Sequence, residues 1–477
     1  MKLEKRDFDA VVVGSGPNGL AAAIYMQQNG LSVLVIEGKD TIGGGLRSAE
    51  LTLPGYVHDI CSAVHPLAFA SPFFKTLPLS NYGLEYTFPD VAAAHPFDNG
   101  KAALLKKSVE KTSQSLGGDE SGYLQLMGRV VADWQTLAPD VLGPLRFPKH
   151  PQMMASFGCK AITSATHLKK KFTTGEAKGF FAGMAAHSML PLNKLTSSAV
   201  ALVLLAAGHL GGWPIPKGGS NQIANALASL FVSLGGVIQT GFYVKSLAEL
   251  PSAHAVLLDV TPRQMLQIAG QQFSSLYKWQ LKRYKYGMGV FKIDWALSGP
   301  IPFKIPECRQ AGTVHIGNTF DEIAFGEQQV WEGKHPEKPF VLLSQPGIVD
   351  SSRAPIGKQT AWAYCHVPGG SEKDMSFAIE NQVERFAPGF KDIILAKHTM
   401  TATQMEIYNP NYIGGDINGG ILNIHQLFTR PALRLSPYKT SAKGVYICSS
   451  STPPGGGVHG MCGFHAAKKA MKDVFKR

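Results

Sequence analysis

The sequence has few of the features that mark secreted, membrane-spanning or disulfide-linked proteins. None of its six cysteines forms a CxxC pair. No segment reaches the ~18 consecutive apolar residues that a membrane-spanning helix needs. The first residues lack the basic region and apolar core of a secretory signal. Together these absences predict an intracellular, cytoplasmic protein with reduced thiols.

Long basic tracts interleaved with aromatic residues are also missing. The chain has 46 Lys and Arg against 34 Asp and Glu, a formal net charge of +12. Because the cations are scattered, we interpret the charge as a basic, soluble surface and predict no nucleic-acid partner. Peripheral contact with an anionic membrane surface stays open, and the sequence leaves the oligomeric state open.

The chain is long enough for more than one domain. Its 477 residues predict two or three domains, and 44% hydrophobic with 17% charged residues is typical of a globular protein. No internal repeat or low-complexity segment interrupts it. Many of its 51 glycines are clustered, which indicates tight turns or backbone that approaches a ligand.

The N-terminal segment predicts a complete βαβ unit. A short apolar strand at 9–13 precedes GSGPNG, a helix that ends at Gly30, and a second strand that ends at Glu37. Residues 66–210 are mostly helical in character. Further strands are predicted at 237–247, 255–260, 289–297 and 444–450, and a basic helix at 461–475.

Three glycines in the first turn form a G-x-G-x-x-G fingerprint. Gly14 allows the tight turn, Gly16 lets the backbone approach a pyrophosphate, and Gly19 lets the helix pack on the strand. The helix N-terminus then offers N–H groups and the positive end of its dipole to phosphates. Glu37, at the end of the next strand, suits a ribose hydroxyl. This combination predicts a dinucleotide-binding site.

Two further glycine loops favour FAD over NAD. Gly43 to Gly45 and Arg47 follow the second strand, where the backbone could approach the ligand again and a cation could face the pyrophosphate. The loop GGGVHG precedes the last helix, so its N–H groups could stabilise the negative charge of a reduced flavin. An NAD-only dehydrogenase has no obvious need for the first of these loops.

These motifs resemble the flavin amine oxidase and phytoene desaturase superfamily. The segments PGYVHDICSAVHP (54–66), YGMGVFKIDWAL (286–297) and STPPGGGVHGMCGFHAA (451–467) resemble its bacterial phytoene dehydrogenase-like subgroup, which includes the pyridine nucleotide-disulphide oxidoreductase domain 2 proteins. The resemblance covers nearly the whole chain and is least specific from about 100 to 200.

The resemblance implies an α/β fold with a discontinuous Rossmann-type FAD-binding domain and an inserted α+β substrate domain. The first would comprise 1–65, 212–265 and 405–477, and the second 66–211 and 266–404. It also implies that FAD is held by ten residues: Gly14, Gly16, Gly19, Glu37, Gly44, Arg47, Val244, Ser451, Gly457 and Val458. Val244 would contact the adenine from a strand, and the last three would lie along the flavin. No metal site is expected.

Lys292 is the first candidate for a catalytic residue. It lies in the alternating stretch GVFKIDWAL and resembles the lysine that reaches the flavin N5 through a water in amine oxidases. The alternation places Lys292, Asp294 and Ala296 on one face of the strand. A solvent-facing strand lysine is the other interpretation.

Two histidines are further candidates. His58 or the adjacent Asp59 could face the flavin, and His459 lies in the last glycine loop. An imidazole titrates near neutral pH and suits acid–base work, although a hydrogen-bonded structural histidine is the commoner case. Trp213, Tyr56 and Phe464 are candidates for an apolar pocket or for the core.

The sequence therefore predicts an FAD-dependent oxidoreductase. It would transfer a hydride between a hydrophobic, polyene- or lipid-like substrate and the flavin, as a dehydrogenase or desaturase does. An amine oxidase acting on a small amine, a non-redox isomerase that uses reduced FAD, and a flavin-binding interaction protein remain as alternatives, because a fold alone does not determine function. The substrate, the direction and the electron acceptor stay open.

Overall fold

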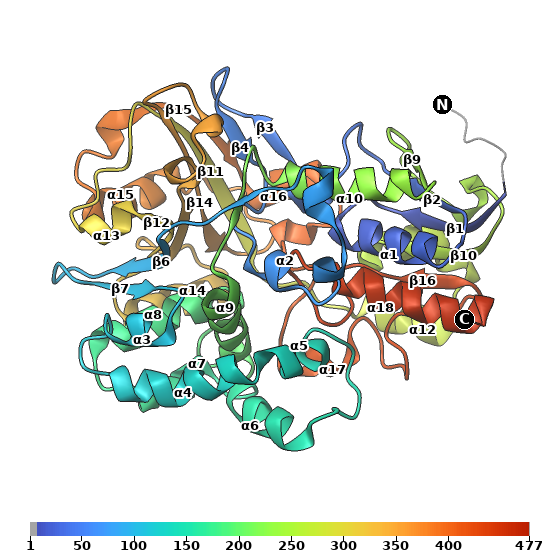
Figure 1. Cartoon of the computed structure of the whole chain (residues 1–477), viewed down its shortest axis with the longest axis horizontal. Coiled ribbons are helices and arrows are strands. Elements are labelled where there is room, and N and C mark those ends of the chain that lie inside the picture. The colour runs from blue at the N-terminus through green and yellow to red at the C-terminus, as the bar shows by residue number, and fades with distance from the viewer. Residues whose placement is uncertain (1–6, 477) are drawn as a thin grey trace.

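The computed structural model describes residues 7–476 and contains two large sheets (Figure 1). Residues 1–6 and 477, which belong to the predicted FAD-binding domain, lie outside the described residues. The first sheet has five parallel strands in the order β16-β10-β1-β2-β9. Their bounds are β1 Phe8–Val13, β2 Val33–Ile36, β9 Val237–Gln239, β10 Ala253–Leu258 and β16 Val445–Ile447.

This sheet confirms the predicted Rossmann-type fold. All five strands come from the three segments that the sequence assigns to nucleotide binding, although the domain boundaries themselves stay a prediction. Val12 and Val35 pack against helices α1 (Pro17–Gln28), α10 (Asn221–Ser233) and α18 (Met461–Ala470). Val11 and Ile36 pack on the other face, against α11 (Pro262–Ala269) and α12 (Ser275–Lys282). Burial on both faces explains why these strands are continuously apolar.

The second sheet has seven strands in the order β15-β11-β14-β13-β12-β6-β7 and is mixed, with β12 and β6 parallel. The bounds are β6 Val91–Pro96, β7 Ala102–Leu105, β11 Gly289–Leu297, β12 Ala311–Ile316, β13 Val341–Ser344, β14 Gln359–Val367 and β15 Ile394–Met400. Phe291, Ile293 and Trp295 cover one face together with α15 (Ser376–Phe386). The alternate residues face the interior of the molecule, where the candidate site lies.

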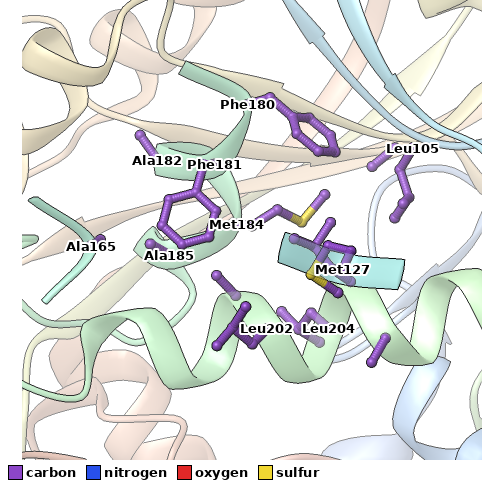
Figure 2. Close-up of a cluster of buried hydrophobic side chains, with 14 of the residues drawn as sticks. Leu105, Met127, Ala165, Phe180, Phe181, Ala182, Met184, Ala185, Leu202 and Leu204 are labelled. Atoms are coloured by element: carbon purple, nitrogen blue, oxygen red, sulfur yellow. The ribbon is translucent and has the colours of Figure 1, made fainter. Parts of the chain in front are cut away.

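A group of helices covers the remaining side of the second sheet. It comprises α4 (Glu120–Ala132), α5 (Trp134–Val141), α6 (Pro151–Ala161), α8 (Gly175–Ala186), α9 (Ser197–Gly211) and α14 (Phe320–Trp331). Figure 2 shows the core between them, where Met127, Phe181, Met184 and Leu202 meet. No helix in residues 7–476 is both long and apolar enough to cross a membrane.

The smaller elements connect these layers. They are β3 (Ser48–Glu50), β4 (Val57–Asp59), β5 (Tyr86–Thr87), β8 (Ile215–Pro216), α2 (Pro66–Ala70), α3 (Val109–Ser113), α7 (Ala165–Leu168), α13 (Pro306–Arg309), α16 (Ala402–Tyr408) and α17 (Ile424–Thr429).

One local prediction was wrong, and another missed two strands. The strand predicted at 237–247 ends at Gln239, because Gly241 adopts a left-handed φ of +69° and turns the chain. Val244 therefore lies outside a strand. Residues 66–210 are mostly helical, as predicted, but they also contain β6 and β7, whose alanines favour a helix in isolation. Pairing of β6 with β12 and β7 outweighs that preference.

Candidate functional site

A single cavity of about 600 Å³ joins the two sheets. It begins at the carboxyl ends of the parallel strands, where Gly14, Glu37, Asp259 and Ser449 follow β1, β2, β10 and β16 and line its wall. Ligands of open parallel sheets bind in this crevice, and the volume is typical of a small-molecule site.

The fingerprint glycines are required by close packing. Gly14 has a φ of +105°, and a Cβ on it would stand 3.0 Å from Asp259. A Cβ on Gly19 would stand 2.1 Å from the Gly14 carbonyl oxygen, so this glycine lets α1 pack on β1 as predicted, and it does not line the cavity. Gly16 lines the cavity, and Gly44 lies so close that its Cβ would be 3.1 Å from the Gly16 Cα. No side chain fits between these two loops.

Glu37 and Arg47 form a buried ion pair at the cavity wall, with Arg47 Nη2 3.1 Å from Glu37 Oε1. The other Glu37 oxygen accepts hydrogen bonds from the Ser15 amide (3.0 Å) and hydroxyl (2.6 Å), and Oε1 also accepts from the Lys39 amide. Arg47 in turn donates to the carbonyl oxygens of Thr41 and Gly44. The chain itself thus uses the lone pairs of Glu37, and a ribose hydroxyl would have to replace one of these donors.

Asp259 is a cavity residue that the sequence analysis missed. Its carboxylate accepts the Gly19 N–H at 2.9 Å, the amide of the first turn of α1. Burial raises the pKa of Asp259 to about 7, and the negative charge of Glu37 adds to the rise. The hydrogen bond from Gly19 favours the ionised form and partly offsets this rise. Its place directly after a parallel strand was the available signal.

The other predicted cofactor residues fall into two groups. Val244, Gly457 and Val458 line the cavity together with Gly44 and Arg47. Ser451 does not: it is fully buried and its hydroxyl donates to the Gly419 carbonyl oxygen at 2.6 Å. Ser449 and Ser450 line the cavity in its place, since the chain turns inward after them. The serines of this loop that line the cavity therefore lie one and two positions before the predicted Ser451.

The far end of the cavity is apolar and aromatic. Trp213, Trp362 and Tyr364 line it, and the rings of Trp362 and Tyr364 stack with centroids 5.7 Å apart. Further wall residues are Val64, Leu67, His187, Leu204, Thr313 and Leu342. Histidines aside, the described wall has four acidic or basic residues, and they lie near the strand ends of the first sheet: Glu37, Lys39, Arg47 and Asp259. Tyr56 and Phe464, the two other predicted pocket residues, are absent from the described wall.

His187, one of these wall residues, forms a pair with the buried His315. Its Nε2 lies 2.9 Å from the Nε2 of His315, so one ring donates to the other. Burial lowers the pKa of His187 to about 3 and that of His315 well below its usual value. The pair is therefore neutral at physiological pH, and the apolar end of the cavity carries no formal charge from it.

Lys292 is not among the residues that line the described cavity, and its place beside a flavin stays a prediction. It is buried, and its Nζ lies 2.5 Å from both oxygens of Asp294, which confirms that the two residues share a face of β11. Its ammonium is 5.6 Å from the ring of Trp362, and its partner across the sheet is Tyr364. Lys292 thus lies beside two wall residues, on the same face of the sheet.

The two predicted histidines are structural in position. His58 is bound to the Thr52 hydroxyl (2.8 Å) and lies 3.8 Å from Asp294, and burial lowers its pKa to about 4. His459 accepts the Met461 N–H at its Nδ1 (3.0 Å) at the start of α18, and burial lowers its pKa to about 4 too. Neither side chain lines the described cavity, and Asp59, the alternative to His58, instead pairs with Arg353. Among residues 7–476 no cluster of metal-ligating side chains is found.

The geometry defines a dinucleotide-binding fold with a second, apolar compartment, and comparison with known proteins agrees. Residues 12–75 match the family described as NAD(P)-binding Rossmann-like domain. The chain is 24% identical to pyridine nucleotide-disulfide oxidoreductase domain-containing protein 2 of Rattus norvegicus, over 98% of this chain and 94% of that protein. It is 21% identical to phytoene desaturase (lycopene-forming) of a Paracoccus species, over 95% of each. The resemblance that the motifs indicate is confirmed.

Solved structures show the same fold. An oxidoreductase from Methanosarcina mazei has a TM-score of 0.66 at 14% identity, over 98% of this chain and 100% of that one. Putrescine oxidase bound to putrescine has a TM-score of 0.65 at 16% identity, over 99% and 100%. Cyclohexylamine oxidase from Brevibacterium oxydans has a TM-score of 0.61 at 15% identity, over 99% and 100%. Desaturase-type and amine oxidase-type proteins are thus both similar to this chain.

Proposed function

We propose that the protein is an FAD-dependent oxidoreductase that transfers a hydride between an apolar, polyene- or lipid-like substrate and the flavin, as a dehydrogenase or desaturase does. One observation carries the proposal: a single cavity has its charged wall residues at the strand ends of the first sheet and an uncharged aromatic wall against the second. Relatives with names of this type support it.

The wall at the strand ends fits FAD. Gly14, Gly16 and Gly44 leave backbone bare of side chains where a pyrophosphate would approach, and Arg47 supplies a cation there. Val244 lines the cavity where we propose that the adenine binds, and Gly457 and Val458 precede α18, whose N-terminus favours negative charge. These residues are the ones we propose to hold the cofactor.

Bound FAD supplies a group that accepts or returns a hydride. The chain would supply the surroundings. Leu67, Leu204 and Leu342 exclude water from the far end, and the stacked rings of Trp362 and Tyr364 offer a flat surface to an unsaturated substrate. Lys292 and Asp294 lie beside those rings on the same face of the sheet and pair with each other, so they expose almost no charge.

An amine oxidase is the second candidate. The aromatic pair Trp362 and Tyr364 could hold a small amine, and two proteins of similar fold are amine oxidases by name. The lack of a carboxylate among the described wall residues at the aromatic end speaks against a cationic substrate, because a desolvated ammonium needs a counter-charge.

Anaerobic reduction tests both candidates. The purified protein should show a flavin absorption band, and an isoprenoid polyene should bleach it where cyclohexylamine does not. Bleaching by the amine alone would favour the amine oxidase, and conversion of the polyene without net bleaching would favour an isomerase. A colourless protein that takes up no FAD would refute the cofactor proposal.

A pair of variants distinguishes an effect on the apolar end of the cavity from an effect on folding. Leu342→Asn places an amide in the wall and should slow bleaching by the polyene roughly tenfold or more, because an unpaired polar group must be buried against the substrate. Thr360→Val is the control, since Thr360 is buried in the neighbouring strand β14 without lining the described cavity. Both variants should retain the flavin band.

A further inference from the structure

One face of the molecule combines exposed apolar side chains with a strong excess of cations. We call it the basic–apolar face. Its apolar members are Leu145 and Phe147 after α5, Leu276 and Trp279 on α12, and Leu433 and Leu435 after α17. Their exposed fractions run from 54% for Trp279 to 111% for Leu435. A folded chain gains nothing from presenting six large apolar side chains to water, so such a patch indicates a contact surface.

The three segments that carry these side chains are neighbours in space. The Leu433 N–H donates to Gln280 Oε1 of α12 at 2.9 Å, and the Arg434 guanidinium lies 5.1 Å from the Tyr277 ring. Arg146 also lies near this segment. Burial raises the pKa of Tyr438, three residues beyond Leu435, and the charge of Arg146 opposes that rise. In Figure 1, α5, α12 and α17 all lie on the lower right side.

The charge of the chain is concentrated in the same segments. Residues 141–175, 260–293 and 417–472 contain 19 Lys and Arg and no Asp or Glu. The rest of the chain contains 27 Lys and Arg against 34 Asp and Glu. Not all cations of the three segments belong to the face, since Lys292 is buried against Asp294 and Lys169 pairs with Asp321 of α14. Its exposed cations include Lys149, Lys282, Arg283 and Arg434, together with Arg146, which pairs with Asp140.

We propose that the basic–apolar face docks the protein on an anionic lipid bilayer. The apolar side chains enter the headgroup region, with Trp279 at its level, and the surrounding cations face the anionic headgroups. This surface is a bilayer contact without a membrane-spanning segment. The proposal does not depend on the cofactor or on the reaction.

A lipid surface fits this face better than two other occupants. A two-fold dimer would place identical cation-rich patches against each other, and like charges across an interface oppose association. A nucleic acid would neutralise the cations but leave Phe147, Leu433 and Leu435 in water. A bilayer with anionic headgroups satisfies both the charge and the apolar side chains.

Vesicle co-sedimentation of the full-length protein tests the proposal. At roughly 0.1 M salt, where the Debye length is ~10 Å, the protein should bind vesicles of phosphatidylcholine with phosphatidylserine roughly tenfold or more tightly than pure phosphatidylcholine. Salt near ~1 M should weaken that difference, because it screens the attraction. Equal binding to both vesicles, or binding to neither, would overturn the proposal.

Matched variants locate the contact. The double variant Leu433→Ser and Leu435→Ser should lower vesicle affinity several-fold, and Phe377→Ser with Ile356→Ser should not, although both pairs remove exposed apolar side chains. Phe377 belongs to α15, on the opposite side of Figure 1.

A charge-reversal pair completes the test. Lys282→Glu with Arg434→Glu should abolish the preference for anionic vesicles, whereas Lys338→Glu with Lys358→Glu changes the net charge equally and should preserve it. Two other results would overturn the proposal. One is a dimer, by light scattering, that Leu435→Ser dissociates. The other is duplex DNA that displaces vesicles at equal phosphate concentration.

Discussion

At the scale of single residues, Asp259 has the largest consequence for ligand binding. Its carboxyl group packs against Gly14 and Gly16 and accepts the Gly19 N–H, so it lies directly beneath the loop proposed to hold the pyrophosphate. With a pKa of about 7, it is protonated in mild acid and ionised in mild base. A second negative charge then faces the phosphates together with Glu37.

This titration predicts pH-dependent dinucleotide binding. Between pH ~6 and ~8 the affinity for FAD should fall, by up to roughly tenfold, because the ionised Asp259 carboxylate repels a pyrophosphate. Asp259→Asn keeps an oxygen to accept the Gly19 N–H and should bind equally at both pH values. Calorimetric titration of the apoprotein measures both. A wild-type affinity that is flat with pH would contradict the prediction.

The same group predicts a stability profile. The pKa of Asp259 rises from 3.8 to about 7 on folding, so the folded state keeps a proton that the unfolded state releases. The contribution to stability is fully present below the unfolded pKa and is lost as pH rises through about 7. The Tm of the apoprotein should therefore fall between pH ~5 and ~8 by more in the wild type than in Asp259→Asn. An equal fall in both would remove Asp259 from this role.

At the scale of elements, β11 carries a buried ion pair on its inward face. Lys292 and Asp294 compensate each other with almost no exposure, and His58 and His398 flank the same carboxylate. Asp294→Asn should lower the free energy of unfolding by about 3–5 kcal/mol, because it leaves the Lys292 ammonium buried without a counter-charge. The double variant with Lys292→Met should recover most of this loss. Denaturant unfolding measures both, and an unaffected single variant would contradict the pairing.

The elements that the sequence predicts well are those with local causes. The fingerprint, the strands around it and β11 follow from spacing, alternation and turn residues within short windows. For Asp259 the sequence offers only its place at the end of a strand, because its partner Gly19 is 240 positions away and the parallel pairing of β1 and β10 joins them. Alternation placed Lys292 and Asp294 on one face, but the ion pair that withdraws Lys292 from the cavity is a matter of side-chain packing.

At the scale of the whole molecule, the cavity brings together segments that are far apart in the sequence. Its wall draws on both sheets and on segments from Val13 to Val458, so a ligand that fills it contacts residues that are far apart in the sequence. The basic–apolar face lies on segments other than those that supply most of this wall. Docking and ligand binding can therefore be altered independently, which is why their experiments use different variants.

Thermal stabilisation by cofactor fragments tests this connection. A ligand that binds only the folded state, at 100 times its Kd, adds about 2.7 kcal/mol to the free energy of unfolding. FAD spans the proposed adenine end at Val244 and the flavin end at Val458, so at equal concentration it should raise the Tm of the apoprotein most. FMN lacks the adenosine half and ADP lacks the flavin, so each should give a smaller shift.

Gly44→Val should remove the FAD shift, because its side chain would meet the Gly16 backbone where the two loops touch. Arg146→Glu, on the basic–apolar face, should leave that shift intact. If NAD matched FAD, or if FMN alone gave the full shift, the two ends of the cavity would not act as one site.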